Sequence, residues 1–327
     1  MATKRQALSH DGELRPALLV DYIKIARPDH WIKNLFILPG FLIAVLLIDQ
    51  PPDASVYCRV VMAFLSTCLI SSANYVINEW LDAQFDRFHP VKKNRPVVTA
   101  NIRGKYVVIE YILLLSAGLL LGLFINRSFF LMSVFLLVMG IFYNVEPMRT
   151  KDIPYLDVLS ESINNMIRLL MGWFIFAETT LPPCSIILGY WMSGAFLMAT
   201  KRFAEYRMIN NPEQAGMYRK SFKGYTEATL LASSFFYAIV SNFLIGIFLI
   251  KYKIELIVAF PFLVILFVKY ILIAYKEDSA AQKPEKLYRE KGLFLIIVLF
   301  SIAIVIGGTV KITFLDIFLG VKLISFE

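Results

Sequence analysis

Apolar stretches long enough to cross a lipid bilayer recur from one end of the chain to the other. A hydrocarbon core of about 30 Å is spanned by roughly 20 residues of α-helix, and backbone that faces lipid must satisfy its own hydrogen bonds. We predict nine such helices, at 34–49, 57–77, 106–125, 128–143, 155–176, 185–200, 227–250, 254–275 and 292–310. The predicted fold class is therefore all-α, a polytopic membrane protein with about nine transmembrane helices.

The composition favours one membrane domain and no separate soluble domain. Of the 327 residues, 58% are hydrophobic and only 18% are charged, which lies outside the usual balance of soluble globular proteins. We predict a polar N-terminal segment at 1–20, a single transmembrane domain at 21–310 and a C-terminal tail at 311–327. Because no small-residue cleavage site follows the polar segment, we expect no removable signal peptide.

The basic residues indicate topology rather than nucleic-acid binding. The formal net charge is +8, and 25 of the 33 Lys and Arg lie in the N-terminal segment and in the loops after the second, fourth, sixth and eighth predicted helices. Loops rich in Lys and Arg stay in the cytoplasm, so we place the N-terminus and these loops there and the C-terminus outside. The predicted location is the inner (plasma) membrane, with a multi-pass topology and no nucleic-acid partner.

The sequence lacks the signatures of several other kinds of site. Cys58, Cys68 and Cys184 form no C-x-x-C pair and the three histidines are scattered, which disfavours zinc or haem ligation. There is no Walker A motif, no Rossmann glycine fingerprint and no G-x-S-x-G motif.

An acidic stripe follows the second predicted helix, in NEWLDAQFDRFHPVKKNRP, residues 78–96. If that helix continues past Ile77, Glu79, Asp82 and Asp86 fall within about 60° of one another on one face. Carboxylates this close repel each other unless a cation neutralises them, and oxygen-only ligands suit Mg²⁺ bound together with substrate phosphates. The stripe is about 10 Å long, which suits two ions with a diphosphate between them. The alternative is a solvated helix end whose acids pair with Lys92, Lys93 and Arg95.

A second polar cluster lies between the fourth and fifth predicted helices, in YNVEPMRTKDIPYLDVLSESINNMIR, residues 143–168. Asp157, Glu161, Asn164 and Arg168 share one face of the fifth helix. An ionisable side chain at membrane depth costs about 2.5–3.5 kcal/mol on insertion scales, so such residues normally face a polar cavity. Together with the acidic stripe, this cluster predicts a polar cavity that opens to the cytoplasm. A structural network that only fixes helix packing is the alternative.

Two basic elements lie on the same predicted side of the membrane. Lys201 and Arg202 begin a basic loop that reaches Lys223, and Lys33 and Asn34 end the segment RPDHWIKN before the first helix. Both elements can contact phosphate groups over the cavity. The alternatives are contacts with anionic lipid headgroups for the loop, and an ordinary aromatic and basic membrane anchor for the segment.

These motifs resemble those of the UbiA superfamily of intramembrane prenyltransferases. The family motif N-D-x-x-D-x-x-x-D is similar to NEWLDAQFD, and the second Asp-rich motif of the family resembles YNVEPMRTKDIPYLD. Within the superfamily, RPDHWIKN, NEWLDAQFDRFHPVKKNRP, TKRFAEYR and YRKSFKGYT are similar to segments of decaprenyl-phosphate phosphoribosyltransferases. There are two departures: Glu79 stands where the family usually has Asp, and PMRTKDIPYLDVLS looks more like the loop of ordinary polyprenyl transferases.

The resemblance implies a nine-helix fold with Mg²⁺ as cofactor, phosphoribosyl pyrophosphate as donor and a polyprenyl phosphate as acceptor. It further implies a role in furnishing sugars to the cell envelope. The metal ligands expected from it are Asn78, Glu79, Asp82, Asp86, Asp152 and Asp157. The expected catalytic residues are Asp82, Asp86, Asp157 and Lys201, and the expected substrate-binding residues are Lys33, Asn34, Asn78, Tyr143, Arg149, Lys151, Arg168 and Arg202.

Two other functions stay open at the level of sequence. In a prenyltransferase the diphosphate belongs to the lipid, and a small aromatic or other acceptor attacks it over the same Mg²⁺ site. A non-enzymatic lipid-binding or transport protein would carry broken helices in matched halves of the chain, and no convincing pair is evident. The extra bases at 201–223 favour phosphoribosyl transfer, because that reaction brings two further phosphate groups.

Overall fold

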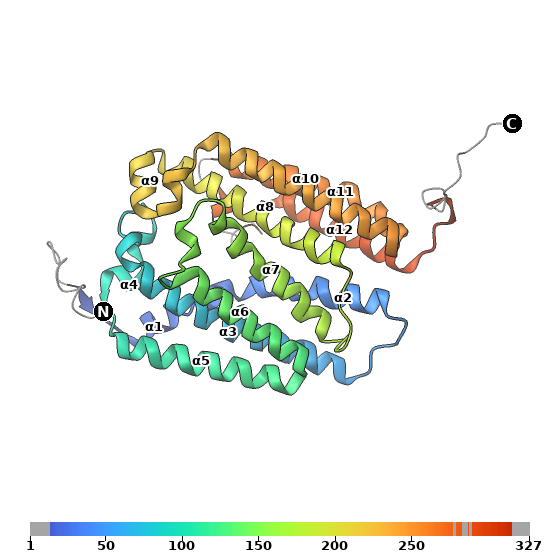
Figure 1. The fold of residues 1–327 in the computed structure, drawn as a ribbon, viewed down its shortest axis with the longest axis horizontal. Helices are drawn as coiled ribbons and strands as arrows, with labels where there is room; N and C mark the ends of the chain where they lie inside the picture. The colour runs from blue at the N-terminus through green and yellow to red at the C-terminus, as the bar shows by residue number, and fades with distance from the viewer. Residues whose placement is uncertain (1–13, 277–278, 283–286, 288–289, 316–327) are drawn as a thin grey trace.

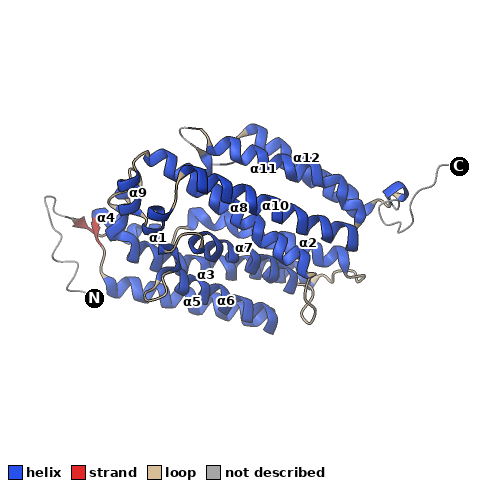
Figure 2. Ribbon diagram, turned by 45° about the horizontal axis from the view of Figure 1, so that its top comes forward, coloured by secondary structure: helices blue, strands red, loops and turns tan. Residues whose placement is uncertain are grey.

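The structure is built almost entirely from helices (Figure 2). The computed structural model describes residues 14–276, 279–282, 287 and 290–315. The α-helices are α1 (Leu19–Ile25), α2 (Leu38–Leu47), α3 (Ser55–Asp86), α4 (Pro96–Thr99), α5 (Gly104–Ile125), α6 (Arg127–Asn144), α7 (Leu156–Phe174), α8 (Cys184–Ile209), α9 (Pro212–Tyr218), α10 (Glu227–Tyr252), α11 (Phe260–Ala274) and α12 (Lys291–Thr309). The 3₁₀ helices are η2 (Pro28–Ile37), η3 (Lys92–Asn94), η4 (Thr150–Asp152), η5 (Lys220–Gly224), η6 (Ile254–Ala259) and η7 (Ala280–Gln282). Two short strands, β1 (Arg15–Pro16) and β2 (Ala100–Asn101), form a parallel pair.

Helix α7 lies in the middle of the bundle (Figure 1), where it packs against α2, α6 and α8. Helices α3, α5 and α6 pack together as one group, and α8, α10, α11 and α12 form a second group. A side chain on α7 can therefore meet residues from both groups.

Seven helical stretches of the described residues are long and apolar enough to cross a membrane: 19–47, 55–86, 104–125, 127–144, 227–252, 254–274 and 291–309. The all-α, polytopic membrane fold predicted from the sequence is thereby confirmed. Helices α7 and α8 coincide with the two other predicted spans, but α7 carries three ionisable side chains and α8 has polar residues along its length. The count of nine spans stays a prediction, as do the domain boundaries, whose outer segments lie largely outside the described residues.

Two glycines let α2 and α7 cross at backbone contact. A Cβ added to Gly40 would lie 1.9 Å from the carbonyl oxygen of Leu169, and one added to Gly172 would lie 1.8 Å from that of Ile37. Small residues allow helix backbones to approach closely inside membranes, where packing contacts drive association. This crossing fixes the position of α7, and with it the polar face that the sequence placed on this helix.

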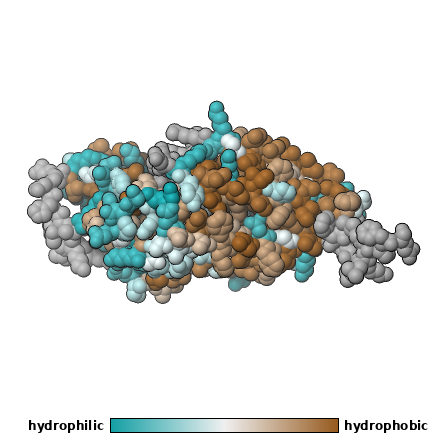
Figure 3. Space-filling model, turned by 90° about the horizontal axis from the view of Figure 1, so that it is seen from above, coloured by the Kyte–Doolittle hydropathy of each residue, from teal (hydrophilic) through white to brown (hydrophobic). Residues whose placement is uncertain are grey.

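One end of the bundle is polar. In Figure 3 hydrophilic residues gather at the end that carries α4 and α9 in Figure 1, and hydrophobic residues dominate the rest of that surface. We call this the polar end. Along the helices, large apolar side chains such as Phe124 and Phe236 are 70% and 60% exposed, as expected for a surface that faces lipid.

Two helices extend beyond their predicted spans into the polar end. Helix α3 continues past Ile77 to Asp86, which confirms the condition on which the acidic stripe was predicted. Helix α8 continues to Ile209, so Lys201 and Arg202 lie on a helix and not in a loop. The polar segments that follow are ordered as short helices, η3 and α4 after α3, and α9 and η5 after α8. Since α9 contacts both α3 and α8, these segments close over the polar end.

Candidate active site

A small pocket at the polar end joins the two acidic clusters. Its lining comes from three segments: Asp82, Phe85 and Asp86 on α3; Arg149, Lys151 and Asp152 at η4; and Tyr218, Arg219 and Lys220 where α9 meets η5. The two acid-rich segments, which are far apart in the sequence, therefore meet in space. Basic side chains from two of the three segments surround them.

Arg149 links the two clusters directly. Its guanidinium donates to Asp82 Oδ1 at 2.9 Å, to Asp152 Oδ2 at 3.1 Å and to the backbone carbonyl of Asn144 at 3.0 Å. The Arg149 backbone has a φ of 27°, in the left-handed region that costs a non-glycine residue about 1–3 kcal/mol. The three hydrogen bonds offset that cost, and they hold the η4 loop against α3.

Lys151 is buried beside the same carboxylate. Its ammonium group donates to Asp82 Oδ1 at 2.6 Å, Asn78 Oδ1 at 3.0 Å and Asn144 Oδ1 at 2.8 Å. Burial lowers the pKa of Lys151 to about 8, and the negative charge of Asp82 opposes this shift. Lys220 approaches Asp152 from η5 at 3.0 Å. Cations thus stand beside the acids of both segments, where phosphate oxygens could be bound.

The other two acids of the α3 stripe face arginines. Arg95 forms salt bridges with Glu79 at 3.0 Å and with Asp86 at 2.8 Å, and Arg27 approaches Glu79 at 3.4 Å. Asp86 also lines the small pocket, whereas Glu79 does not. A pairing of these acids with Arg95 is what the alternative interpretation, a solvated helix end, predicted. The stripe therefore contains acids that pair with Arg95 and acids that line the pocket.

Asp157 does not reach the pocket. Its carboxylate is fully buried and accepts hydrogen bonds from Tyr225 at 2.8 Å, Ser221 at 3.1 Å and Arg202 at 3.3 Å. Burial, together with this carboxylate, raises the pKa of Tyr225, so the phenol stays protonated and donates. A buried carboxylate needs partners of this kind. The structure places Asp157 as an anchor that ties η5 to the start of α7.

Arg202 stands at the centre of a buried network behind the pocket. It forms salt bridges with Asp157 and Glu161, and it is only 1% exposed. Tyr143 donates to Glu161 at 2.8 Å, and the Lys201 ammonium group lies 3.9 Å from the same carboxylate. Of the expected substrate-binding residues, Arg202 and Tyr143 therefore connect α8, α6 and α7 and do not line the pocket.

Lys33, Asn34 and Arg168 also lie outside the small pocket. Arg168 donates from Nε to Asn34 Oδ1 at 2.9 Å and from Nη2 to Ser71 Oγ at 3.3 Å. The Lys33 ammonium group lies 3.0 Å from His30 Nδ1. Arg168, Asn34 and Ser71 form a second polar region, deeper along α3 and α7 than the pocket.

The donor set of the small pocket fits a hard divalent cation. Asp82, Asp86 and Asp152 offer oxygen ligands only. Within the part of the chain that the structure describes, no three acidic, histidine or cysteine side chains converge as a metal cage. Mg²⁺ commonly binds one or two carboxylates and completes its coordination shell with water and substrate phosphates. The residues present therefore fit Mg²⁺ that binds together with a phosphorylated substrate.

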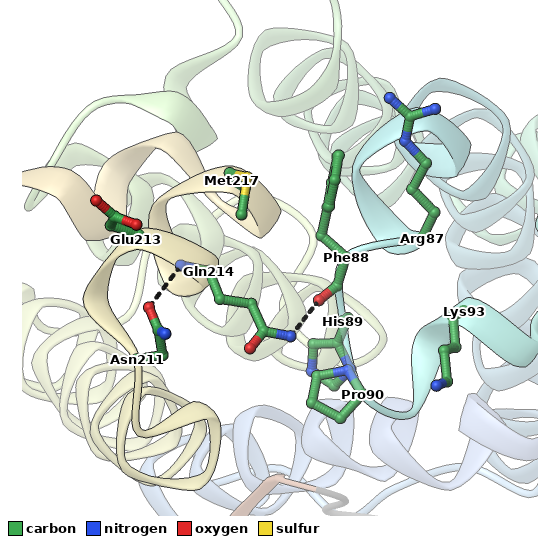
Figure 4. Close-up of a pocket in the computed structure, with 9 residues that line it drawn as sticks. All are labelled: Arg87, Phe88, His89, Pro90, Lys93, Asn211, Glu213, Gln214 and Met217. Atoms are coloured by element: carbon green, nitrogen blue, oxygen red, sulfur yellow. Dashed lines mark hydrogen bonds between the residues drawn. The ribbon is translucent and has the colours of Figure 1, made fainter. Parts of the chain in front are cut away.

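A larger pocket of about 390 Å³ also lies at the polar end (Figure 4). It is lined by Arg87, Phe88, His89, Pro90 and Lys93 after α3, and by Asn211, Glu213, Gln214 and Met217 at α9. Gln214 donates across this pocket to the carbonyl of Phe88 at 3.0 Å. The rings of His89 and Tyr218 contact each other with centroids 4.5 Å apart, so one aromatic wall separates the two pockets.

Three groups at the site were not predicted from the sequence. Phe85 and Tyr218 line the small pocket, and Asn144 binds the ammonium group of Lys151. Asn144 could have been found, because an amide directly after Tyr143 at the end of an apolar helix needs a polar partner. The pairing of half-buried Lys92 with buried Glu205 at 2.7 Å gave no such signal, since the two residues are 113 positions apart.

Comparison with known protein families supports the resemblance. The model of the UbiA prenyltransferase family matches residues 36–295, which is most of the chain. The chain belongs to the UbiA prenyltransferase family. This UbiA-family protein is therefore a multi-pass membrane protein.

Two curated relatives carry the same name. The chain is 32% identical over 217 residues to a decaprenyl-phosphate phosphoribosyltransferase of Mycolicibacterium smegmatis, a match that covers 65% of each chain. It is 27% identical over 227 residues to the decaprenyl-phosphate phosphoribosyltransferase of Mycobacterium tuberculosis, covering 68% of this chain and 72% of the other. The chain thus spans slightly less than two thirds of the first relative's length, and the similarity to this group expected from the motifs is confirmed.

A solved structure shares the fold. The UbiA homologue from Archaeoglobus fulgidus, solved bound to DMAPP and Mg²⁺, superposes with a TM-score of 0.66 at 20% sequence identity. The match covers 88% of this chain and 99% of the other. At this identity the likeness establishes the UbiA fold alone.

Proposed function

We propose that this protein transfers 5-phosphoribose from phosphoribosyl pyrophosphate to a polyprenyl phosphate in a reaction that depends on Mg²⁺. The observation that carries the proposal is the pocket in which Arg149 joins Asp82 to Asp152 among basic side chains. The similarity to two decaprenyl-phosphate phosphoribosyltransferases supports this choice of donor and acceptor.

The pocket residues divide into two roles. Asp82, Asp86 and Asp152 would hold Mg²⁺, which when bound neutralises the charge of the leaving diphosphate. Arg149 and Lys151 would grip phosphate oxygens of the donor, since charge-assisted hydrogen bonds to phosphate are short and strong. Both cations lie within hydrogen-bond distance of Asp82 Oδ1, so when Mg²⁺ and the donor bind they would turn from this carboxylate to the phosphate oxygens.

The proposed chemistry needs no general base. A phosphate monoester is already an anionic nucleophile at neutral pH. One of its oxygens forms a bond to ribose C1 while the bond from C1 to the diphosphate oxygen breaks, and the electron pair leaves with the diphosphate. The protein supplies position and electrostatic stabilisation, which account for most of the catalysis in reactions of this kind.

A prenyltransferase is the second candidate. The solved Archaeoglobus fulgidus homologue carries DMAPP and Mg²⁺ in the same fold, so a prenyl diphosphate could present its diphosphate to the same acids. The basic residues Arg219 and Lys220 at the pocket favour the first candidate, because phosphoribosyl transfer brings additional phosphate groups. A non-enzymatic lipid-binding or transport role is the third candidate.

A transfer assay tests the proposal. Purified protein in lipid nanodiscs receives labelled phosphoribosyl pyrophosphate, polyprenyl phosphate and Mg²⁺. We expect label in the lipid fraction with the wild type, and a loss of at least about a hundredfold with Asp82→Asn. Asp53→Asn, at an exposed loop position, is the matched control and should keep the wild-type rate. Transfer only from a prenyl diphosphate would select the second candidate, and no transfer from either donor would favour the third.

We further propose that the protein lies in the plasma membrane with the polar end in the cytoplasm. Phosphoribosyl pyrophosphate is a soluble donor, so its pocket has to open to the compartment that holds it. The concentration of Lys and Arg in the loops assigned to that side supports this orientation. The product would serve as a sugar donor for the cell envelope.

A further inference from the structure

Arg168 is a buried charge that the proposed diphosphate pocket leaves unexplained. It lies on α7, is 8% exposed, and donates to Asn34 Oδ1 at 2.9 Å, Ser71 Oγ at 3.3 Å and the backbone carbonyl of Asn164 at 3.2 Å. All three acceptors are neutral, and no carboxylate among the described residues forms a salt bridge with this guanidinium. By contrast, the buried cations Arg149, Lys151 and Arg202 each pair with an acid.

A guanidinium without a counter-charge is costly inside a membrane protein. Buried charges are normally paired, and an ionisable side chain at membrane depth usually marks a ligand or a transport path. An arginine has five N–H donors, of which Arg168 uses three, so two remain for a further acceptor. An anion from outside the chain would satisfy both the charge and these donors.

A neighbouring side chain points to the same conclusion. Asn164 lies one helical turn nearer the polar end than Arg168, on the face of α7 that both residues share. The Oδ1 atom of Asn164 is buried without a hydrogen-bond partner. Because an amide can present either its oxygen or its NH₂ group in a given direction, Asn164 offers a second polar group to a ligand there.

The position of Arg168 relative to the diphosphate pocket limits what the anion can be. Its partner Ser71 precedes Asp82 by eleven residues on α3, which corresponds to about 16 Å along the helix. The Arg168 side chain itself points back toward the start of α7, because side chains on a helix lean toward its N-terminus. This separation is longer than the distance between the phosphate groups of one sugar phosphate, so an anion at Arg168 belongs to a second molecule that approaches from deeper in the bundle.

We propose that Arg168, assisted by Asn164, binds the phosphate group of the lipid acceptor at a site separate from the diphosphate pocket. The ligand is a phosphate monoester at the head of an apolar chain, held at a depth where that chain can pass between helices into lipid. Arginine suits this task, since its planar guanidinium matches phosphate oxygens in a bidentate manner and keeps its charge at all relevant pH values. The identity of the lipid rests on the proposed function, whereas the presence of an anion site does not.

Binding of the acceptor alone tests this inference without any turnover. The affinity of purified protein for a fluorescent short-chain polyprenyl phosphate is measured without donor and without Mg²⁺. We expect Arg168→Gln to weaken binding by about ten- to a hundredfold, the effect of losing charge-assisted hydrogen bonds. Arg168→Lys keeps the charge but loses the planar fork, so it should fall in between. Arg59→Gln is the matched control, because Arg59 pairs with Asp53 at a distant, exposed part of α3 and should leave the affinity unchanged.

A second ligand shows whether the variant is intact. Arg168→Gln should bind inorganic diphosphate with Mg²⁺ as the wild type does, because Arg168 does not line that pocket. If Arg168→Gln does not fold, Arg168→Lys decides: weaker lipid binding with unchanged diphosphate binding supports the inference, and unchanged lipid binding overturns it. Ribose 5-phosphate is the competing source of a phosphate monoester. An Arg168 variant that loses ribose 5-phosphate but keeps the lipid would assign the site to the donor and overturn the inference.

The outcomes for this site and for the proposed function can be told apart. Wild-type lipid affinity in Arg168→Gln, together with ribose transfer by the wild type, would overturn the acceptor site and leave the proposed function standing. Loss of lipid binding in Arg168→Gln, without ribose transfer by the wild type, would support the anion site and overturn the proposed function.

Discussion

Asp82 and Glu79 lie about one turn apart on α3 yet have different partners. Asp82 meets Arg149 and Lys151 in the pocket, whereas Glu79 is 3% exposed and faces Arg95. We therefore predict that Asp82→Asn raises the Mg²⁺ concentration needed for half-maximal transfer by at least about a hundredfold. Glu79→Gln should change this concentration by less than about tenfold. The measurement is the Mg²⁺ concentration that gives half-maximal transfer. Equal effects of the two substitutions would return Glu79 to the metal ligands, where the sequence motif placed it.

His89 is a buried histidine at the wall between the two pockets. Its Nδ1 accepts from the backbone N–H groups of Val91 and Lys92, both at 3.1 Å. Burial lowers the pKa of His89 below its ordinary value of 6.5. The unfolded chain therefore binds a proton below pH 6.5 that the folded chain excludes, and stability falls as the pH drops through this range, by up to about 1.4 kcal/mol per pH unit.

This linkage predicts a pH-dependent melting temperature. Between pH 7.5 and pH 5.5 the thermal midpoint of the wild type should fall by a few degrees more than that of His89→Gln, in which the titrating group is absent. Thermal unfolding at both pH values, in the same detergent, measures the difference. An equal fall in both proteins would mean that His89 is protonated in the folded state.

At the scale of secondary-structure elements, the contact between α2 and α7 depends on glycine. We predict that Gly172→Ala destabilises the protein by about 1–3 kcal/mol, because the new Cβ would lie 1.8 Å from the Ile37 carbonyl oxygen. Gly246→Ala is the matched control, since a Cβ there meets nothing within 4 Å and alanine favours a helix. Thermal midpoints of the two variants measure the effect, and a Gly172→Ala variant as stable as Gly246→Ala would mean that the helices do not cross in contact.

The helices also show which patterns in the sequence are sufficient to predict secondary structure. The long apolar runs predicted membrane-spanning helices, and Glu79, Asp82 and Asp86 were expected on one face on the condition that α3 continues past its apolar part, which it does. The segments at 87–103 and 210–226 contain no long periodic pattern, so their order as η3, α4, α9 and η5 could not be predicted. That order depends on pairs between distant residues, such as half-buried Lys92 with buried Glu205.

At the scale of the whole molecule, the orientation in the membrane stays a prediction. In a protein whose native cysteines are replaced by serine, a membrane-impermeant maleimide added to intact cells should label Asp53→Cys and not Glu213→Cys. Both positions are exposed, and they lie in loops assigned to opposite sides by the distribution of Lys and Arg. Permeabilised cells should label both. Labelling of Glu213→Cys alone in intact cells would place the polar end outside.

The candidate site could be predicted in part from the sequence. The residue types in each segment predicted acids beside bases, and Asp82, Asp86, Arg149, Lys151 and Asp152 do line one pocket. The sequence could not separate these residues from Asp157 and Glu79, because helix periodicity gives the face of a residue but not its partners. Only the folded chain shows that Tyr225 and Ser221 occupy the carboxylate of Asp157.

Binding of inorganic diphosphate, titrated calorimetrically with and without Mg²⁺, tests most directly whether acids from both segments hold the ion. We predict that Mg²⁺ strengthens diphosphate binding in the wild type and in Asp53→Asn. Asp82→Asn on α3 and Asp152→Asn at η4 should each remove that effect. A full Mg²⁺ effect in either of these two variants would contradict the account, because the ion would then be held by one segment alone.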